Sequence, residues 1–203
     1  MFRLIKIFIV LLCFFFADFA YCNSEMDDVA KQLNTYMQKL TNLKARCAHI
    51  SNNKVREGTI CFIKSKSPKL MIRYEIGHGQ KQEFLIKKGW LYVFDIAKQK
   101  VISNKKLAGD PLYEILTGEF DFSKQKFNHI FEKGVLHVNL FRKGFKFPPL
   151  ILHFSYKNEK VVNLIGWTVN DGKNIAELII DEESIRINSP SVPDLEFEFT
   201  KVE

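Results

Sequence analysis

The stretch that decides the fold is LHVNLFRKGFKFPPLILHFSY, residues 136–156. Large apolar residues occupy every second position over Leu136–Leu140 and again over Leu150–Tyr156, mostly with polar residues between them. Lys143 and Gly144, between the two runs, are typical of a turn. Because successive side chains of a strand point to opposite faces of a sheet, the stretch predicts two antiparallel strands, each with one buried face.

The same two-residue period recurs over most of the chain after Leu43, and turn-forming residues separate the runs. No interval between the runs is long enough for repeated crossover helices, so we expect roughly ten strands in one antiparallel sheet. Outside residues 136–156, the apolar positions that define the period are Ile72, Tyr74, Ile76, Phe84, Ile86, Ile185, Ile187, Leu195, Phe197 and Phe199.

Two segments have a helical period instead. Over Met26–Leu40 the apolar residues recur every three or four positions, and Ser24 supplies an N-cap, which predicts an amphipathic helix. The second segment, Asp110–Thr117, begins with a capping residue and Pro111, and Gly118 follows it. We expect this short helix either to cover the mouth of the sheet as a lid or to pack outside it as a connector.

The N-terminal segment has the parts of a secretory signal peptide. Arg3 and Lys6 precede an apolar run over residues 7–16, which is too short to span a bilayer. Ala20 and Cys22 supply the small residues that a signal peptidase requires before its cut. The segment therefore predicts export.

We expect cleavage between Cys22 and Asn23, so that residues 1–22 are a signal peptide and residues 23–203 form a single domain. Two alternatives remain open. One is a lipoprotein signal with Cys22 as the lipidated residue, although Tyr21 stands where such a signal has a small residue. The other is an uncleaved membrane anchor.

Composition and motifs disfavour several classes of function. The formal charge is +7, but the basic residues are scattered among acids, so we expect no nucleic-acid partner. The sequence has no Gly-x-Ser-x-Gly motif and no complete dinucleotide-binding loop, and we expect no enzyme activity and no cofactor. No metal site is expected either, because the histidines lack the close spacing of zinc ligands: His49, His78, His129, His137 and His153.

Two cysteines, Cys47 and Cys61, lie in the expected domain. Residues 52–54 are typical of a turn, and a hairpin centred near Lys54 would place the two cysteines opposite each other. An exported protein meets oxidising conditions, so a disulfide between them is possible. The alternative is a pair of small buried side chains.

In their order along the chain, these features resemble the LolA family, the periplasmic carriers of outer-membrane lipoproteins. The amphipathic helix leads into Leu43–His49, similar to the family's Leu-x-Ala-x-Phe-x-Gln pattern, with cysteine and histidine at the Phe and Gln positions. Gly58 then opens a strand that ends near Pro68. Lys87–Asp95 resembles the family's Asp-Gly hairpin, with lysine in place of the Asp, and Asp110–Leu116 resembles its lid helix.

The resemblance implies a mainly β fold: a half-open antiparallel β-barrel of about eleven strands, with the N-terminal helix and the short lid helix over its mouth. It implies a monomeric periplasmic carrier without a cofactor. The carrier would take the acyl chains of lipoproteins from an inner-membrane ABC transporter and deliver them to an outer-membrane acceptor. Some relatives hold the lid with an arginine just before the proline; Ser67 stands there in this chain, so Lys66 and Arg73 are the latch candidates.

We expect the acyl chains to meet large apolar residues of the strands and of the two helices. These residues are Leu33, Met37, Ile72, Tyr74, Leu112, Ile115, Leu116, Leu136, Val138, Leu140, Leu152, Phe154, Phe197 and Phe199. A rival hypothesis is a lipid-sensing or protein-sensing envelope module with the same shell. An enzyme with a polar constellation in the cavity is a third.

Overall fold

A computed structural model describes most of the chain. The described residues are 26–51, 54–76, 80–107, 110–140, 149–170 and 175–189, together with Phe197 and Phe199. The expected signal peptide, its cleavage site after Cys22 and the expected N-cap Ser24 lie outside them. Over the described residues, no helix has both the length and the apolar character needed to cross a membrane.

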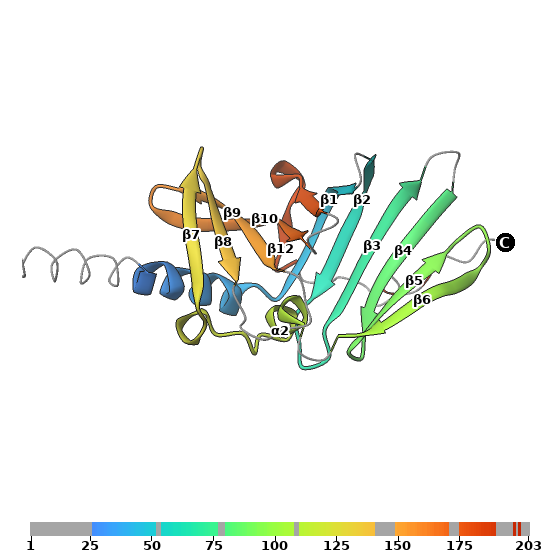
Figure 1. Cartoon of the computed structure of the whole chain (residues 1–203), viewed down its shortest axis with the longest axis horizontal. Helices are drawn as coiled ribbons and strands as arrows, with labels where there is room; N and C mark the ends of the chain where they lie inside the picture. Colours follow the sequence, from blue (N-terminus) through green and yellow to red (C-terminus); the bar gives the residue numbers. More distant parts are fainter. Residues whose placement is uncertain are drawn as a thin grey trace, which may run out of the picture.

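Antiparallel pairing joins the strands into one curved sheet (Figure 1). The strands are β1 (Asn42–Ser51), β2 (Lys54–Ile63), β3 (Lys69–Ile76), β4 (Gln80–Lys87), β5 (Trp90–Asp95), β6 (Lys100–Lys106), β7 (Phe127–Glu132), β8 (Val135–Leu140), β9 (Leu150–Lys157), β10 (Lys160–Asn170), β11 (Ile175–Ile180) and β12 (Arg186–Ile187). Their order is β6-β5-β4-β3-β2-β1-β11-β10-β9-β8-β7, and β12 pairs with Leu43 and Lys44 of β1.

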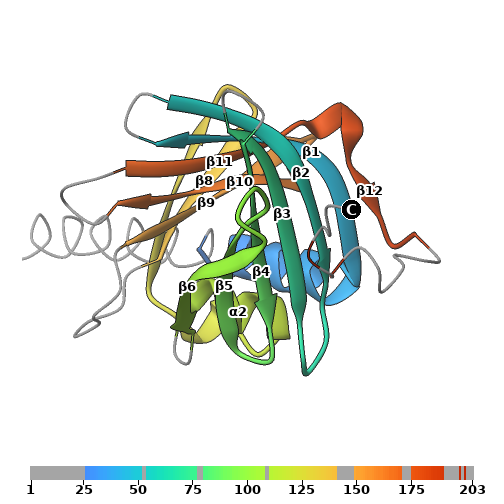
Figure 2. The same cartoon turned by 90° about the vertical axis from the view of Figure 1, so that its right-hand side faces the viewer.

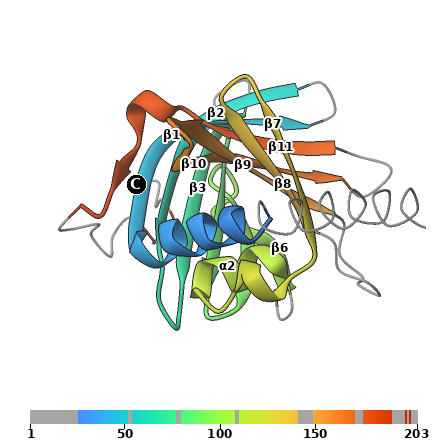
Figure 3. The same ribbon diagram turned by 90° about the vertical axis from the view of Figure 1, so that its left-hand side faces the viewer.

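The sheet curls without closing. β6 and β7 stand at the two ends of the order, and no pairing between described residues joins them. The strands curve round a concave side (Figure 2), and the N-terminal helix (residues 26–39) and α2 (Pro111–Thr117) lie across its mouth (Figure 3). The predicted half-open antiparallel barrel is therefore confirmed, with eleven strands on the main path and β12 beside it.

The ends of α2 are those that its sequence predicts. The side chain of Asp110 accepts a hydrogen bond from the Leu112 N–H, 2.9 Å away, and Pro111 lies in the first turn, where no intrahelical donor is needed. Gly118 ends the helix in the left-handed conformation, with a φ of 78°. These local signals limit α2 to two turns at the mouth of the sheet.

The N-terminal helix is tied to the sheet at two irregularities of β10. The register between β9 and β10 shifts after Val161 and again after Leu164. The Val161 N–H donates to Gln32 Oε1 at 3.1 Å, and the Leu164 N–H donates to the Tyr36 hydroxyl at 2.9 Å. A bulge interrupts the hydrogen bonds between neighbouring strands. At these two positions of β10 the helix therefore accepts hydrogen bonds from N–H groups that do not bond to β9.

Apolar side chains are buried on both faces of the sheet. The main cluster fills the concave side, and a smaller one on the opposite face contains Cys61, Met71, Leu85 and Phe197. Phe199 packs against this second cluster and stacks on Phe94, with ring centroids 4.4 Å apart. The prediction that Phe197 and Phe199 line the cavity is therefore wrong, because they cover the back of the sheet.

The predicted C-terminal strands also differ from the structure. The Asp181 side chain accepts a hydrogen bond from the Glu183 N–H and caps the 3₁₀ helix η2 (Glu182–Ser184). The alternation around Ile185 therefore yields only the two-residue strand β12. Of the run Leu195–Phe199, the described residues are Phe197 and Phe199, and neither lies in a strand.

Of the two alternatives for Cys47 and Cys61, the structure supports the pair of small buried side chains and not the disulfide. In the β1–β2 hairpin Cys47 pairs with Gly58, and Cys61 pairs with Lys44, so the two cysteines are offset by three positions. An odd offset places them on opposite faces of the sheet. Both thiols are buried, and neither forms a disulfide with a described residue.

The β4–β5 turn allows a stability prediction. Lys88 and Gly89 form it with positive φ values of 51° and 76°. Asparagine tolerates this conformation better than lysine does. We expect Lys88→Asn to raise the free energy of unfolding by about 0.5 kcal/mol, measured by urea denaturation. Lys87→Asn, in the preceding strand, is the control and should give no gain; equal behaviour of the two variants would contradict the prediction.

Candidate functional site

An apolar cavity of about 240 Å³ lies on the concave side of the sheet, bounded by β3–β5, by β10 and β11, and by the start of α2. Its wall is aliphatic and aromatic: Leu70, Ile72, Phe84, Ile86, Leu91, Leu107, Leu112, Trp167, Val169, Ala176 and Leu178. The polar side chains in its lining are His49, Tyr74, Lys105 and Asp110. Such a space suits an apolar ligand with a few polar contacts.

The polar side chains lie at two ends of the cavity. Through β4 and β5 the register places Lys105 level with Leu70 of β3. Tyr74 lies four residues further along β3, or about 13 Å at the rise of a strand. His49 stacks on Tyr74, so Lys105 and Asp110 belong to the α2 end and the His49–Tyr74 pair to the other.

A small void of about 10 Å³ continues the cavity beneath α2. Leu70, Leu112 and Trp167 line both spaces and so form the partition between them. Ile115 and Leu116 close the void from above and are almost fully buried. A movement of α2 that withdrew Leu112 would join the two spaces.

The predicted acyl-contact residues of the concave side fall into two groups. Those that line the cavity or the void are Met37, Ile72, Tyr74, Leu112, Ile115, Leu116, Leu152 and Phe154. Those that are buried in the same apolar cluster but line neither space are Leu33, Leu136, Val138 and Leu140. The second group builds the core that supports the site.

Sequence reasoning missed the wall that β10 and β11 contribute. Trp167 and Val169 alternate along β10, and Ala176 and Leu178 alternate along β11. The register pairs Trp167 with Leu178 and Val169 with Ala176, which brings all four to the cavity. Their two-residue period was a usable signal.

Burial shifts three of the polar groups toward their neutral forms. It raises the pKa of Asp110, against the opposing effect of the Leu112 N–H, and it raises the pKa of Tyr74. Burial and the charge of Arg56 lower the pKa of His49 below its usual 6.5. These shifts indicate a site in which a buried charge is costly.

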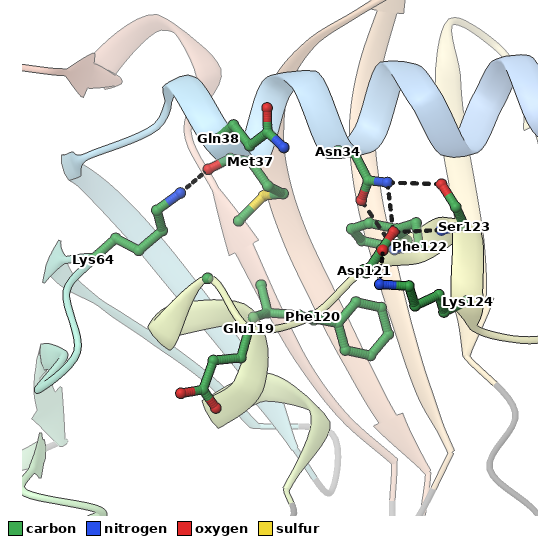
Figure 4. A pocket seen from close by; sticks show the side chains of 12 residues that line it. Asn34, Met37, Gln38, Lys64, Glu119, Phe120, Asp121, Phe122, Ser123 and Lys124 are labelled. Atoms are coloured by element: carbon green, nitrogen blue, oxygen red, sulfur yellow. Dashed lines mark hydrogen bonds and ion pairs between the residues drawn. The ribbon is translucent and has the colours of Figure 1, made fainter.

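One tie at the mouth runs from Lys64, the residue that follows β2, to the N-terminal helix (Figure 4). The Lys64 ammonium donates a hydrogen bond to the carbonyl oxygen of Met37, near the C-terminal end of the helix. The Lys64 stem also lies against the end of α2, because a Cβ added to Gly118 would be 3.4 Å from its Cε. Lys64 thus links the sheet, the helix and the lid, and burial lowers its pKa.

A second tie joins the N-terminal helix to the segment after α2 (Figure 4). Asn34 Nδ2 donates to Asp121 Oδ1 at 2.8 Å, and Asn34 Oδ1 accepts from the Phe122 N–H at 3.0 Å. Phe122 begins the 3₁₀ helix η1 (Phe122–Lys124) and is fully buried. The lid therefore has an anchored C-terminal side, and its Asp110 end lies over the cavity.

The predicted latch residues lie elsewhere. Lys66 is exposed. Arg73 projects from the face opposite α2, where its Nε is 2.7 Å from Oε1 of the buried Glu83. The assignment of the latch to Arg73 is wrong. Along β3 its side chain alternates with those of Ile72 and Tyr74, so it projects from the other face of the sheet. Lys64 holds the mouth instead.

We expect Lys64→Ala to loosen the mouth without unfolding the sheet. Loss of a charge-assisted hydrogen bond of about 1.5 kcal/mol corresponds to roughly a tenfold drop in protection. Amide hydrogen exchange of α2 and of residues 36–39 measures the effect. Lys66→Ala removes an exposed lysine two positions away and should change nothing; equal exchange in both variants would contradict the role of Lys64.

The described residues contain no group of three or more histidine, cysteine, aspartate or glutamate side chains placed to hold a metal ion. The site thus consists of an apolar cavity, its polar ends and the lid.

Comparisons with known proteins support the fold through structure alone. No protein-family model matches the chain, and no curated protein matches it in sequence. Among solved structures, an uncharacterized conserved protein from Thermus thermophilus is similar, with a TM-score of 0.51 and 8% identity over 89% of this chain and 95% of that one.

MucB is similar to the same degree, with a TM-score of 0.51 and 10% identity over 87% of this chain and 63% of MucB. A putative outer membrane lipoprotein-sorting protein domain from Vibrio parahaemolyticus has a TM-score of 0.46 and 11% identity over 85% of this chain and 94% of that one. The chain thus shares the fold of the Thermus thermophilus protein and of MucB, and at these identities the likeness concerns the fold alone.

Proposed function

We propose that this protein is a carrier of the LolA type, which shields lipoprotein acyl chains from water during their passage through the cell envelope. The apolar cavity beneath α2 carries this proposal. Each buried methylene stabilises a complex by about 0.8 kcal/mol, so an acyl chain favours such a wall strongly over water. The proposal describes a binding protein rather than an enzyme.

The cavity has room for part of one acyl chain. Its volume of about 240 Å³ is below the roughly 300–1,000 Å³ of pockets that enclose a whole drug-sized ligand. Displacement of α2 joins the void under Ile115 and Leu116 to the cavity and extends the apolar wall. Loading and release therefore involve the lid.

The proposed route begins with export through the signal peptide at residues 1–22. The mature protein, residues 23–203, acts as a monomer in the periplasm. It takes acylated lipoproteins from an inner-membrane ABC transporter and passes them to an outer-membrane acceptor. Transfer follows rising affinity from one partner to the next, with no cofactor.

Native mass spectrometry of the protein purified from its own envelope tests this function. We expect a co-purifying lipid or acylated lipoprotein that delipidation removes, and a fluorescent fatty-acyl probe that binds the delipidated protein. Protein that carries no lipid and binds no acyl probe under these conditions would refute the carrier function.

A further inference from the structure

One buried polar atom beside the cavity has no partner. Among the buried side-chain nitrogen and oxygen atoms of the described residues, His49 Nδ1 alone makes no hydrogen bond. The His49 ring lines the cavity and stacks on Tyr74, with centroids 5.3 Å apart and planes 18° from parallel. Buried polar atoms are almost always paired, because an unpaired one is costly. The ring position thus points to a missing polar partner.

The environment of His49 keeps its own ring uncharged. Leu178 pairs with His49 on one side of β1, and Arg56 pairs with it on the other. Burial and the Arg56 charge lower the pKa of His49, so the imidazole is neutral near pH 7. A neutral imidazole has one N–H and one acceptor nitrogen. In the tautomer that carries the proton on Nδ1, this atom donates one hydrogen bond to an acceptor such as a carbonyl oxygen.

A water molecule is a poor candidate for this partner. Buried water makes about three hydrogen bonds. Tyr74 is the polar lining side chain next to His49, whereas Lys105 and Asp110 belong to the other end, about 13 Å along the strand. The rest of the lining is apolar. The carbonyl oxygen of a ligand needs only the one bond that Nδ1 offers.

We infer that the cavity is specific for an acyl chain attached through an ester or amide carbonyl, whose oxygen accepts a hydrogen bond from His49 Nδ1. The hydrocarbon then lies along the wall from Ile72 towards Leu91, and the remainder of the lipid leaves at the His49 end. This inference rests on the proposed function and names the residue that gives the same site its specificity.

A pair of ligands, one with an ester group and one without, tests the inference. Methyl dodecanoate and tridecane compete with a fluorescent fatty-acyl probe, whose affinity is measured first for each variant. We expect the ratio of ester affinity to alkane affinity to be about five- to tenfold higher in the wild type than in His49→Phe. His49→Phe keeps a flat ring without the donor, so its loss of affinity should fall mainly on the ester. His49→Gln keeps an N–H donor and should retain part of the higher ratio.

The possible outcomes separate the two proposals. An ester-to-alkane affinity ratio that is the same in the wild type and in His49→Phe would overturn the role of His49 while leaving the carrier function intact. An equal loss for both ligands in His49→Phe would do the same, because it would show that the ring only packs. If the wild type binds neither ligand, the carrier function itself falls, and the inference with it.

Discussion

Ala176→Phe is expected to weaken binding of a fluorescent fatty-acyl probe by at least about tenfold. Ala176 lies on β11, opposite Val169, and its methyl group forms part of the cavity wall. A phenyl ring there occupies space that the acyl chain needs, and exclusion of only two methylenes already costs roughly tenfold in affinity. Titration of the probe into the delipidated variant measures the loss.

The same substitution on the other face of the sheet is the matched control. Ala48 of β1 pairs with Ile179 of β11 and points away from the cavity. Ala48→Phe should therefore bind the probe like the wild type. Circular dichroism melts of both variants establish whether they fold. Wild-type probe affinity in folded Ala176→Phe would show that the cavity is not the binding site.

The sequence predicts the concave face of the sheet well because side-chain alternation is local. Ile72 and Tyr74 point the same way whatever strand lies beside them, and the structure places both at the cavity. The ends of α2 are also predicted, since Asp110 and Gly118 act on backbone groups of the helix itself. Sequence signals that act within a single helix or strand therefore predict its structure correctly.

Strand register and long-range contacts depend on residues far apart in the sequence, and the wrong predictions concern these features. A hairpin centred near Lys54 would place Cys47 opposite Cys61, whereas the structure offsets them by three positions. The residues around Lys64 do not indicate its hydrogen bond to the Met37 carbonyl, because only the fold brings the two residues together. Phe197 has the alternation of a core strand, but it packs on the back of the sheet.

Gly58→Ala is expected to lower the free energy of unfolding by about 3 kcal/mol or more. Gly58 pairs with Cys47 on one side and with Tyr74 on the other. A Cβ at this position would be 2.0 Å from the Arg73 carbonyl oxygen and 2.9 Å from Tyr74 Cδ1. Because the first of these atoms is backbone, β3 itself must move. Urea denaturation of the two proteins measures the difference.

Gly134→Ala is the matched control for this prediction. Gly134 has a φ of 79°, but an added Cβ would meet only the Tyr156 carbonyl oxygen, at 3.8 Å. Its cost is backbone strain of about 1 kcal/mol, so a larger loss in Gly134→Ala than in Gly58→Ala would show that β2 and β3 are not tightly apposed.

The displaced Tyr74 carries the ring on which His49 stacks. The folded fraction of Gly58→Ala should therefore also have a lower ratio of methyl dodecanoate affinity to tridecane affinity than the wild type, whereas Gly134→Ala keeps the wild-type ratio.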